Sequence, residues 1–186
     1  MRKYILPRVV ESTSLTLAEF YQKHNIDPEE LGYLGSGDFG EAYSIDEERV
    51  LKITTSKNEF EIAKELKGNS APILEAFAKI YEAEIIEGRK YIIMEQLDTD
   101  SSIEDLFSEL QTYLDEQDLP IQYLSYLDMD EIDDMSDEVG EFMDSVDDII
   151  RAYRYLGIEA SDIRPENMGY SKDGVLKAFD IDDRHR

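Results

Sequence analysis

Two segments of the chain carry apolar residues at helical spacing. One runs from Ile103 to Leu114 and the other from Val139 to Leu156, and in each an apolar side chain recurs every three or four residues. This period places the apolar side chains on one face of an α-helix. The second segment is acidic at its start, has arginines near its end and is followed by Gly157, which suits a helix dipole and a helix stop. We expect two amphipathic helices whose apolar faces join the core.

The first half of the chain shows shorter patterns. Residues 42–45 and 49–53 are rich in apolar side chains and are separated by acidic residues, which predicts two antiparallel strands joined by a turn. A short helix is expected over residues 56–68, because Ser56 and Glu59 have the spacing of a capping box.

Three glycines, Gly35, Gly37 and Gly40, precede these strands in the pattern G-x-G-x-x-G. In a dinucleotide-binding site such a loop opens a helix, whereas here a strand follows it. Glycines in a hairpin let backbone N–H groups approach phosphate oxygens without interference from a Cβ atom. The pattern therefore favours a phosphate-binding hairpin.

Lys52 lies among apolar neighbours in the strand that follows the hairpin. One interpretation is a lysine on the solvated face of an edge strand. The other is a buried ammonium that binds nucleotide phosphates, and the position after a glycine hairpin favours it. A buried ammonium needs a carboxylate partner. Glu59 and Glu61 are both candidates; Glu59 is slightly favoured, although capping the helix would also explain it.

Asp162, Asn167 and Asp180 form the most informative polar pattern. Asn167 follows Asp162 by five residues, and Asp180 follows Asn167 by thirteen. This spacing places the three side chains at the two ends of one short hairpin, where they can converge on a divalent cation and its phosphates. Asp and Asn are also common turn residues, so the interpretation depends on the other motifs and their order.

Taken in order, these motifs resemble the protein-kinase superfamily over roughly residues 32–183. In that family the glycine loop covers the phosphates of ATP, a lysine pairs with them, an Asp orients the acceptor hydroxyl, and an Asn and a second Asp hold Mg²⁺. The resemblance implies binding of ATP by Gly35, Ser36, Gly37, Phe39, Gly40, Lys52, Glu59, Met94, Glu95 and Leu97, catalysis by Lys52, Asp162 and Arg164, and binding of Mg²⁺ by Asn167 and Asp180.

The resemblance also implies an α+β, kinase-like fold of two lobes in a single domain over residues 1–186. The N-lobe, residues 32–97, holds an antiparallel sheet. The reduced C-lobe, residues 98–186, is acidic and mainly helical. Residues 1–31 form an N-terminal extension with a short helix over residues 15–21, which we expect to pack on the N-lobe.

The chain departs from the family at four places. Arg164 stands where a lysine usually follows the catalytic aspartate by two residues. Ala160 and Ser161 stand where a His-Arg pair usually precedes the catalytic aspartate, and Ile181 and Asp182 replace the Phe-Gly after the metal-binding one. Only six residues follow Asp180, which leaves no room for the segments that hold a protein substrate.

The expected function is ATP- and Mg²⁺-dependent phosphotransfer to a hydroxyl, of the protein Ser/Thr kinase type, with an enzyme favoured over a non-enzyme. Two alternatives remain open. One is a non-catalytic pseudokinase whose acidic surface binds a basic protein, and the other is a small-molecule kinase.

Charge is distributed unevenly. The chain has 44 acidic and 19 basic residues, and residues 91–150 contain 20 of the acidic residues and no Lys or Arg. Such a segment either keeps the surface solvated or attracts a basic protein partner. It disfavours direct nucleic-acid binding, since phosphate contacts need Lys and Arg. The calcium-loop pattern is not met over residues 128–134.

The sequence contains no cysteine, which excludes disulfides and fits a reducing compartment such as the cytoplasm. We expect no membrane contact, because no apolar stretch has the length of a transmembrane helix and the first residues do not form a signal peptide. The two histidines, His24 and His185, fall in segments expected at the surface. With no cysteine and only these two histidines, no zinc site is expected.

Overall fold

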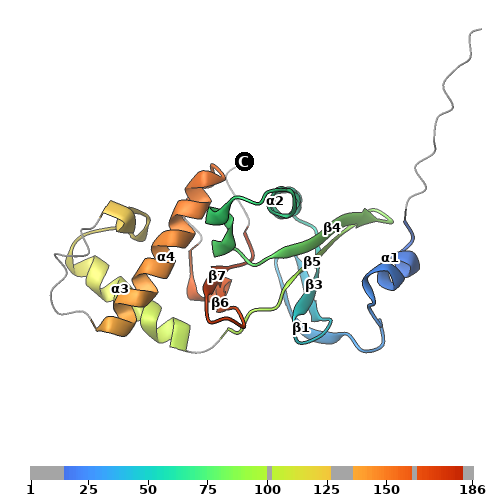
Figure 1. The fold of residues 1–186 in the computed structure, drawn as a ribbon, viewed down its shortest axis with the longest axis horizontal. Helices are drawn as coiled ribbons and strands as arrows, with labels where there is room; N and C mark the ends of the chain where they lie inside the picture. Colours follow the sequence, from blue (N-terminus) through green and yellow to red (C-terminus); the bar gives the residue numbers. More distant parts are fainter. Residues whose placement is uncertain (1–14, 100–101, 127–135, 161–162, 182–186) are drawn as a thin grey trace, which may run out of the picture.

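The computed structural model describes residues 15–99, 102–126, 136–160 and 163–181. These residues form an α+β fold, as expected, with a five-stranded antiparallel sheet, helices and a small hairpin (Figure 1). The elements, in chain order, are α1 (Leu17–His24), β1 (Gly32–Gly37), β2 (Gly40–Ser44), β3 (Arg49–Thr54), α2 (Lys57–Gly68), η1 (Pro72–Ala76), β4 (Ile80–Ile86), β5 (Arg89–Glu95), α3 (Ser102–Glu116), η2 (Ile121–Tyr126), α4 (Asp137–Tyr155), η5 (Pro165–Asn167), β6 (Met168–Tyr170) and β7 (Leu176–Ala178).

The large sheet has the strand order β1-β2-β3-β5-β4, and every neighbouring pair is antiparallel. Lys52 pairs with Ala42 of β2 on one side and with Ile92 of β5 on the other. The interpretation of Lys52 as an edge-strand lysine is therefore wrong, because its strand is the central one.

The two faces of this sheet are covered by different helices. Along β5, Tyr91 and Ile93 face a cluster that includes Phe20 of α1, while Ile92 and Met94 face a cluster that includes Phe60 of α2. Alternate side chains of a strand point to opposite faces, so one buried strand serves both clusters. The described part of the N-terminal extension, residues 15–31, thus packs on the sheet, as expected.

The end of helix α1 is more buried than the sequence indicated. Thr16 caps it through a reciprocal pair of hydrogen bonds with Glu19, and Asn25 ends it in the left-handed conformation. Its last residue, His24, has a side chain that is only 16% exposed. The segment lies at the surface as expected, with Lys23 and Asn25 exposed, but the His24 side chain itself is partly buried, because the final turn of α1 packs against the sheet.

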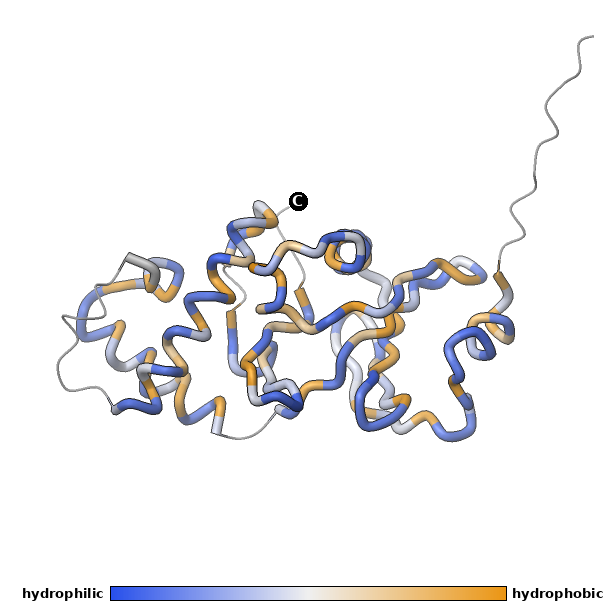
Figure 2. The backbone as a smooth tube through the Cα atoms, viewed as in Figure 1, coloured by the Kyte–Doolittle hydropathy of each residue, from blue (hydrophilic) through white to orange (hydrophobic). Residues whose placement is uncertain are grey.

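The helices predicted from apolar spacing are present as α3 and α4. Their apolar faces form a second core with η1 and the β6–β7 hairpin, in which the rings of Phe77 and Tyr153 lie 5.2 Å apart. Hydrophobic and hydrophilic stretches alternate along both helices in Figure 2. Residues 128–134, which do not meet the calcium-loop pattern, lie outside the described residues.

The β6–β7 hairpin lies between α4 and the large sheet (Figure 1). Backbone hydrogen bonds attach it at two places to segments that flank the strands of the sheet. Asp98 and Tyr170 exchange two backbone hydrogen bonds of 2.8 Å, and the Ala78 N–H donates to the Ala178 carbonyl at 2.8 Å. Gly169 permits this approach, because a Cβ atom there would lie 2.7 Å from the Leu97 Cβ. No helix among the described residues combines the length and apolarity needed to cross a bilayer.

Replacing Gly40 by Ala should destabilise the fold by about 1–3 kcal/mol. The new Cβ atom would overlap the Ile53 carbonyl oxygen and lie 3.0 Å from Thr54 Cα, both backbone atoms that cannot turn away. Gly37→Ala is the matched control, since a Cβ there meets nothing within 4 Å. Guanidinium unfolding midpoints measure both variants, and equal midpoints would contradict this account of the β2–β3 contact.

Candidate functional site

A cavity of about 950 Å³ opens beneath the β1–β2 hairpin. Its walls come from that hairpin, β3, the end of β5 with the chain that follows it, and the β6–β7 hairpin with its flanking residues. Twelve of the residues singled out in the sequence line it, namely Gly35, Ser36, Gly37, Phe39, Gly40, Lys52, Met94, Glu95, Leu97, Arg164, Asn167 and Asp180. Glu59 is not among the lining residues, and Asp162 lies outside the described residues.

The ammonium of Lys52 binds two carboxylates in the wall of this cavity. It contacts Glu59 Oε1, and it lies 2.6 Å from Asp180 Oδ1. The side chains of Lys52 and Glu59 are 13% and 7% exposed, whereas that of Asp180 is 47% exposed. The three residues belong to β3, to α2 and to the segment after β7, so one buried cation links three separate parts of the chain.

Glu59 is the carboxylate on Lys52, and the exposed Glu61 pairs with Lys64 at 3.3 Å instead. The expected capping box is only half formed. Ser56 Oγ accepts a hydrogen bond from the Glu59 N–H at 3.1 Å, but the Ser56 N–H donates to Thr54 Oγ1 rather than to Glu59. The carboxylate of Glu59 is thus directed towards Lys52 and does not complete the box.

Burial and charge act in opposite directions on this ion pair. Burial alone would lower the pKa of Lys52, but the carboxylates of Glu59 and Asp180 outweigh it and raise that pKa above its usual value. Burial raises the pKa of Glu59 despite the nearby ammonium. Its Oε2 is buried, and no described group donates a hydrogen bond to it. Lys52 is therefore a firmly held cation beside a carboxylate that burial makes costly to ionise.

The β6–β7 hairpin brings Asn167 and Asp180 to the same cavity, as their spacing predicted. Asn167 precedes β6, and its carbonyl accepts a hydrogen bond from the Phe179 N–H at 2.8 Å. Asp180 has a φ of 55°, in the left-handed region that few non-glycine residues occupy. Residues held in such conformations cluster at functional sites. An amide oxygen and a carboxylate are ligands that suit Mg²⁺.

The glycines of the β1–β2 hairpin serve two different purposes. A Cβ at Gly35 or Gly37 would meet nothing within 4 Å, whereas Gly40 is needed for strand packing. The first two positions therefore leave open space above the cavity, and a ligand can approach their backbone.

Two residues support the cavity in ways that the sequence did not indicate, and one of them, Glu95, was singled out there only as a candidate for binding ATP. Glu95 Oε2 accepts hydrogen bonds from Lys177 Nζ at 2.8 Å and from the Lys79 N–H at 3.0 Å, so its side chain fastens the end of β5 to β7. Gly169 permits the close approach described above. Their roles depend on contacts between distant segments, and nothing local in the sequence marks them.

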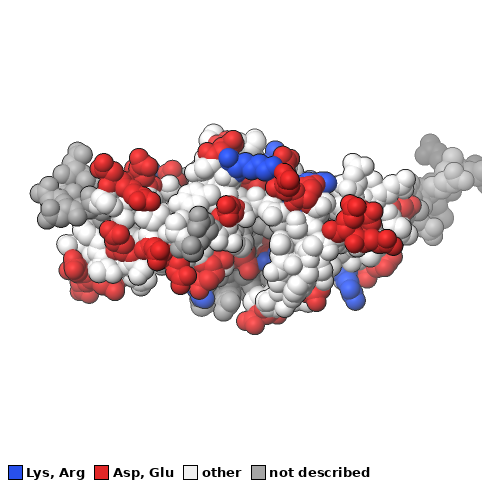
Figure 3. Space-filling view, turned by 90° about the horizontal axis from the view of Figure 1, so that it is seen from below, with Lys and Arg blue, Asp and Glu red and all other residues white. Residues whose placement is uncertain are grey.

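Helices α3 and α4 present an acidic surface away from the cavity. Figure 3 shows acidic side chains spread over the end of the molecule that these helices form. Since residues 91–150 contain no Lys or Arg, no basic residue of α3 or of the first part of α4 offsets them. The exposed acidic residues include Glu104, Asp105, Glu109, Glu138, Glu141 and Asp148.

No model of a known protein family matches this sequence, and no curated protein matches it either.

Replacing Lys52 by Met should lower the free energy of unfolding by about 3 kcal/mol at neutral pH, because Glu59 would keep a buried charge without its cation. The loss should shrink in acid. Burial already raises the pKa of Glu59, and removing the ammonium raises it further, so the variant takes up a proton on folding. Its stability relative to the unsubstituted chain therefore falls as the pH rises through that pKa.

Denaturant unfolding of both proteins between about pH 5 and about pH 8 measures this dependence. Lys64→Met is the control, because its pair with Glu61 is exposed and contributes little. A stability difference that does not change with pH would contradict the assignment of a charged Glu59 to Lys52.

Proposed function

We propose that this chain is a protein-kinase-like phosphotransferase with a two-lobed kinase-like fold, which binds ATP with Mg²⁺ and transfers the γ-phosphoryl group to a hydroxyl of a protein. The observation that carries this proposal is the Lys52 ammonium, held by Glu59 and Asp180 in the wall of a cavity covered by a glycine hairpin. A cation placed in this way can bind phosphate oxygens, while the open backbone at Gly35 and Gly37 donates hydrogen bonds to them.

The charges around the cavity fit a nucleotide that binds together with a divalent cation. The lining includes six acidic residues (Asp38, Glu41, Glu47, Glu95, Asp98 and Asp180) and three basic ones (Lys52, Arg164 and Lys172). A bare polyphosphate would be repelled by this excess of negative charge, and Mg²⁺ supplies the neutralising charge when bound. Asn167 and Asp180 would hold the cation, because both line the cavity and both offer oxygen ligands.

The remaining roles concern the acceptor. Arg164 lines the cavity and would neutralise charge on the transferring group. Asp162 would orient the acceptor hydroxyl. Catalysis of this kind depends on positioning and electrostatic stabilisation rather than on a covalent intermediate.

One specific observation favours a second candidate function. The acidic surface of α3 and α4 lies away from the cavity and would bind a basic protein whether or not phosphoryl transfer occurs. The replacement of the family's His-Arg pair by Ala160 and Ser161 also fits a pseudokinase that acts as an interaction module.

Asp180→Ala should abolish stabilisation by ATP and Mg²⁺. In the unsubstituted chain, the two together at a hundred times the dissociation constant should add about 2.7 kcal/mol to the free energy of unfolding, while ATP alone should add much less. Thermal unfolding measures the shift. Asp173→Ala is the control, because Asp173 is exposed in the turn of the same hairpin and does not line the cavity. If no combination of ligands stabilises the unsubstituted chain, nucleotide binding is excluded.

Asp162→Ala should abolish transfer of the γ-phosphoryl group to a basic test protein such as a histone, yet keep the stabilisation by ATP and Mg²⁺. Transfer is measured with ATP labelled in its γ-phosphate, and complex formation is measured separately at low and high salt. The interaction module would be favoured if the unsubstituted chain forms a complex that weakens with salt but transfers no phosphoryl group. In that case Lys52→Met should not affect formation of the complex. Equal transfer by Asp162→Ala and the unsubstituted chain would contradict the role given to Asp162.

A further inference from the structure

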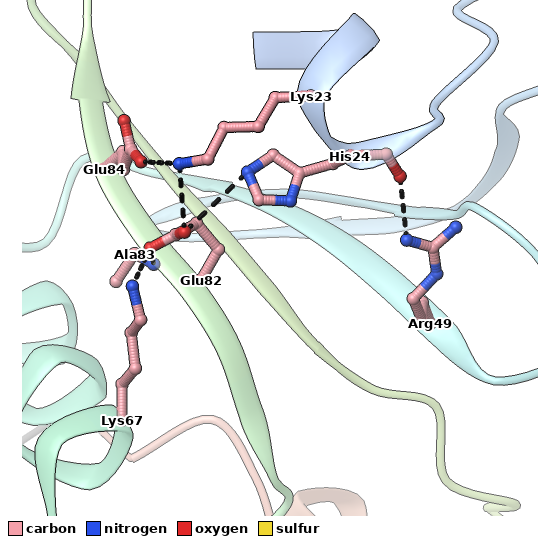
Figure 4. Close-up of polar contacts among 7 residues, drawn as sticks. All are labelled: Lys23, His24, Arg49, Lys67, Glu82, Ala83 and Glu84. Atoms are coloured by element: carbon pink, nitrogen blue, oxygen red, sulfur yellow. Dashed lines mark hydrogen bonds and ion pairs between the residues drawn. The ribbon is translucent and has the colours of Figure 1, made fainter.

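A second polar cluster lies where α1 meets β4, outside the cavity described above (Figure 4). His24 ends α1, and Glu82 and Glu84 project from β4. One ligand atom from each of these three residues lies within 4.8 Å of the other two. A group of one imidazole and two carboxylates was not apparent from the sequence, because His24 and Glu82 are 58 positions apart.

The two oxygens of the Glu82 carboxylate have different partners. Oε1 accepts hydrogen bonds from Lys67 of α2 and from the Ala83 N–H at 3.1 Å. Oε2 faces the other way, towards Lys23 Nζ at 3.3 Å and His24 Nε2 at 3.8 Å. The same ammonium of Lys23 lies 2.6 Å from Glu84 Oε1. The place between the two carboxylates therefore already holds a cation, the ammonium of Lys23.

His24 directs a nitrogen towards this place without a hydrogen bond. Its Nε2 is buried and has no hydrogen-bond partner among the described residues. The ring is held by Phe20, with the ring centres 4.8 Å apart, and the backbone by Arg49, which donates to the His24 carbonyl at 2.9 Å. A buried polar atom without a partner is costly and calls for an explanation.

The charge state of His24 suits a ligand. Burial lowers the pKa of the imidazole, and the positive charge of Lys23 lowers it further, against the opposing effect of Glu82 and Glu84. The ring is therefore neutral at neutral pH, which is the form that binds metal ions.

We propose that His24, Glu82 and Glu84 form a zinc site that fastens α1 to β4, and that the ammonium of Lys23 occupies this site when zinc is not bound. One imidazole nitrogen and two carboxylate oxygens are ligands that zinc accepts, with water in the fourth position of a tetrahedron. Imidazole disfavours Mg²⁺ and Ca²⁺, which prefer oxygen ligands. The ligand atoms must move closer together to bind one ion, since the nitrogen and the nearer oxygen are 3.8 Å apart and all three atoms lie within 4.8 Å of one another.

Lys23 is the residue that zinc must displace. Its side chain is 48% exposed and lies in the last turn of α1, so the ammonium can move into solvent. Lys67 can stay, because it binds the other oxygen of Glu82. Zinc then places two positive charges between the same carboxylates, where the ammonium of Lys23 placed one. Because Lys23 competes with zinc in this way, replacing Lys23 should raise the affinity for zinc, and this tests the proposal.

The experiment is a titration of the full chain with Zn²⁺ by calorimetry, repeated with Co²⁺, whose visible absorption reports nitrogen and oxygen ligation. We expect saturable binding to a single strong site. His24→Gln should weaken it by more than about tenfold, because loss of a direct ligand costs at least as much as loss of an outer-shell partner. Lys23→Met should strengthen it several-fold, because the competing ammonium is gone. Excess Mg²⁺ should leave binding unchanged.

Two matched controls distinguish zinc binding at this site from non-specific attraction of Zn²⁺ to an acidic chain. His185→Gln removes the only other histidine, and Lys64→Met removes an ion pair elsewhere on the surface. Both should bind Zn²⁺ as the unsubstituted chain does. If His24→Gln does not fold by circular dichroism, Glu84→Gln takes its place, since the ion-pair partner of Glu84 among the described residues is Lys23, whose side chain is 48% exposed. Equal affinity in the ligand variant and the unsubstituted chain, or weaker binding by Lys23→Met, would overturn the proposal.

Discussion

The ammonium of Lys52 lies between two carboxylates from segments that are distant in the sequence. Glu59 comes from the first turn of α2, and Asp180 follows the β6–β7 hairpin. An isolated charge at this depth would be strongly unfavourable, so α2 and the hairpin must both be in place before the central strand can carry a lysine. The pairing of Lys52 with Glu59 and Asp180 limits how these elements pack, and it also forms the charged wall of the cavity.

The rest of the architecture keeps these three elements in register. Alternating side chains of β5 bury α1 on one face of the sheet and α2 on the other. The hairpin is attached by backbone hydrogen bonds at Asp98 and Ala178 and by the ion pair between Glu95 and Lys177. Because these attachments lie on both sides of the hairpin, the position of Asp180 follows from the packing of the sheet rather than from a flexible loop.

Two buried glutamates show how local donors decide the state of a carboxylate. Burial raises the pKa of Glu59, and the Lys52 ammonium and the Thr54 side chain, which both lower this pKa, do not reverse the direction. Burial acts in the same way on Glu82, but hydrogen bonds from Lys67, the Ala83 N–H and Lys23 outweigh it and lower the pKa. The donors around Glu82 therefore outweigh burial and those around Glu59 do not, so Glu82 holds lysines from two helices while Glu59 depends on Lys52.

Local patterns were sufficient for much of this molecule. Helical spacing predicted α3 and α4, turn and strand signals predicted the glycine hairpin and the strand of Lys52, and the spacing of Asn167 and Asp180 predicted a hairpin with both at its ends. Period, caps and turns act between residues that are close in the sequence, so a single sequence carries them. The roles proposed for these residues in binding ATP and Mg²⁺ stay predictions.

Other features required contacts between distant segments. The choice of Glu59 over Glu61, the central place of Lys52 and the burial of His24 depend on which elements pack together. Burial, strand order and ion pairing arise only when segments far apart in the chain meet, and no local period encodes them. For that reason the amino-acid order alone predicted candidate functional residues such as Lys52, Asn167 and Asp180, while the packing of the sheet, helices and hairpin decided which side chains meet.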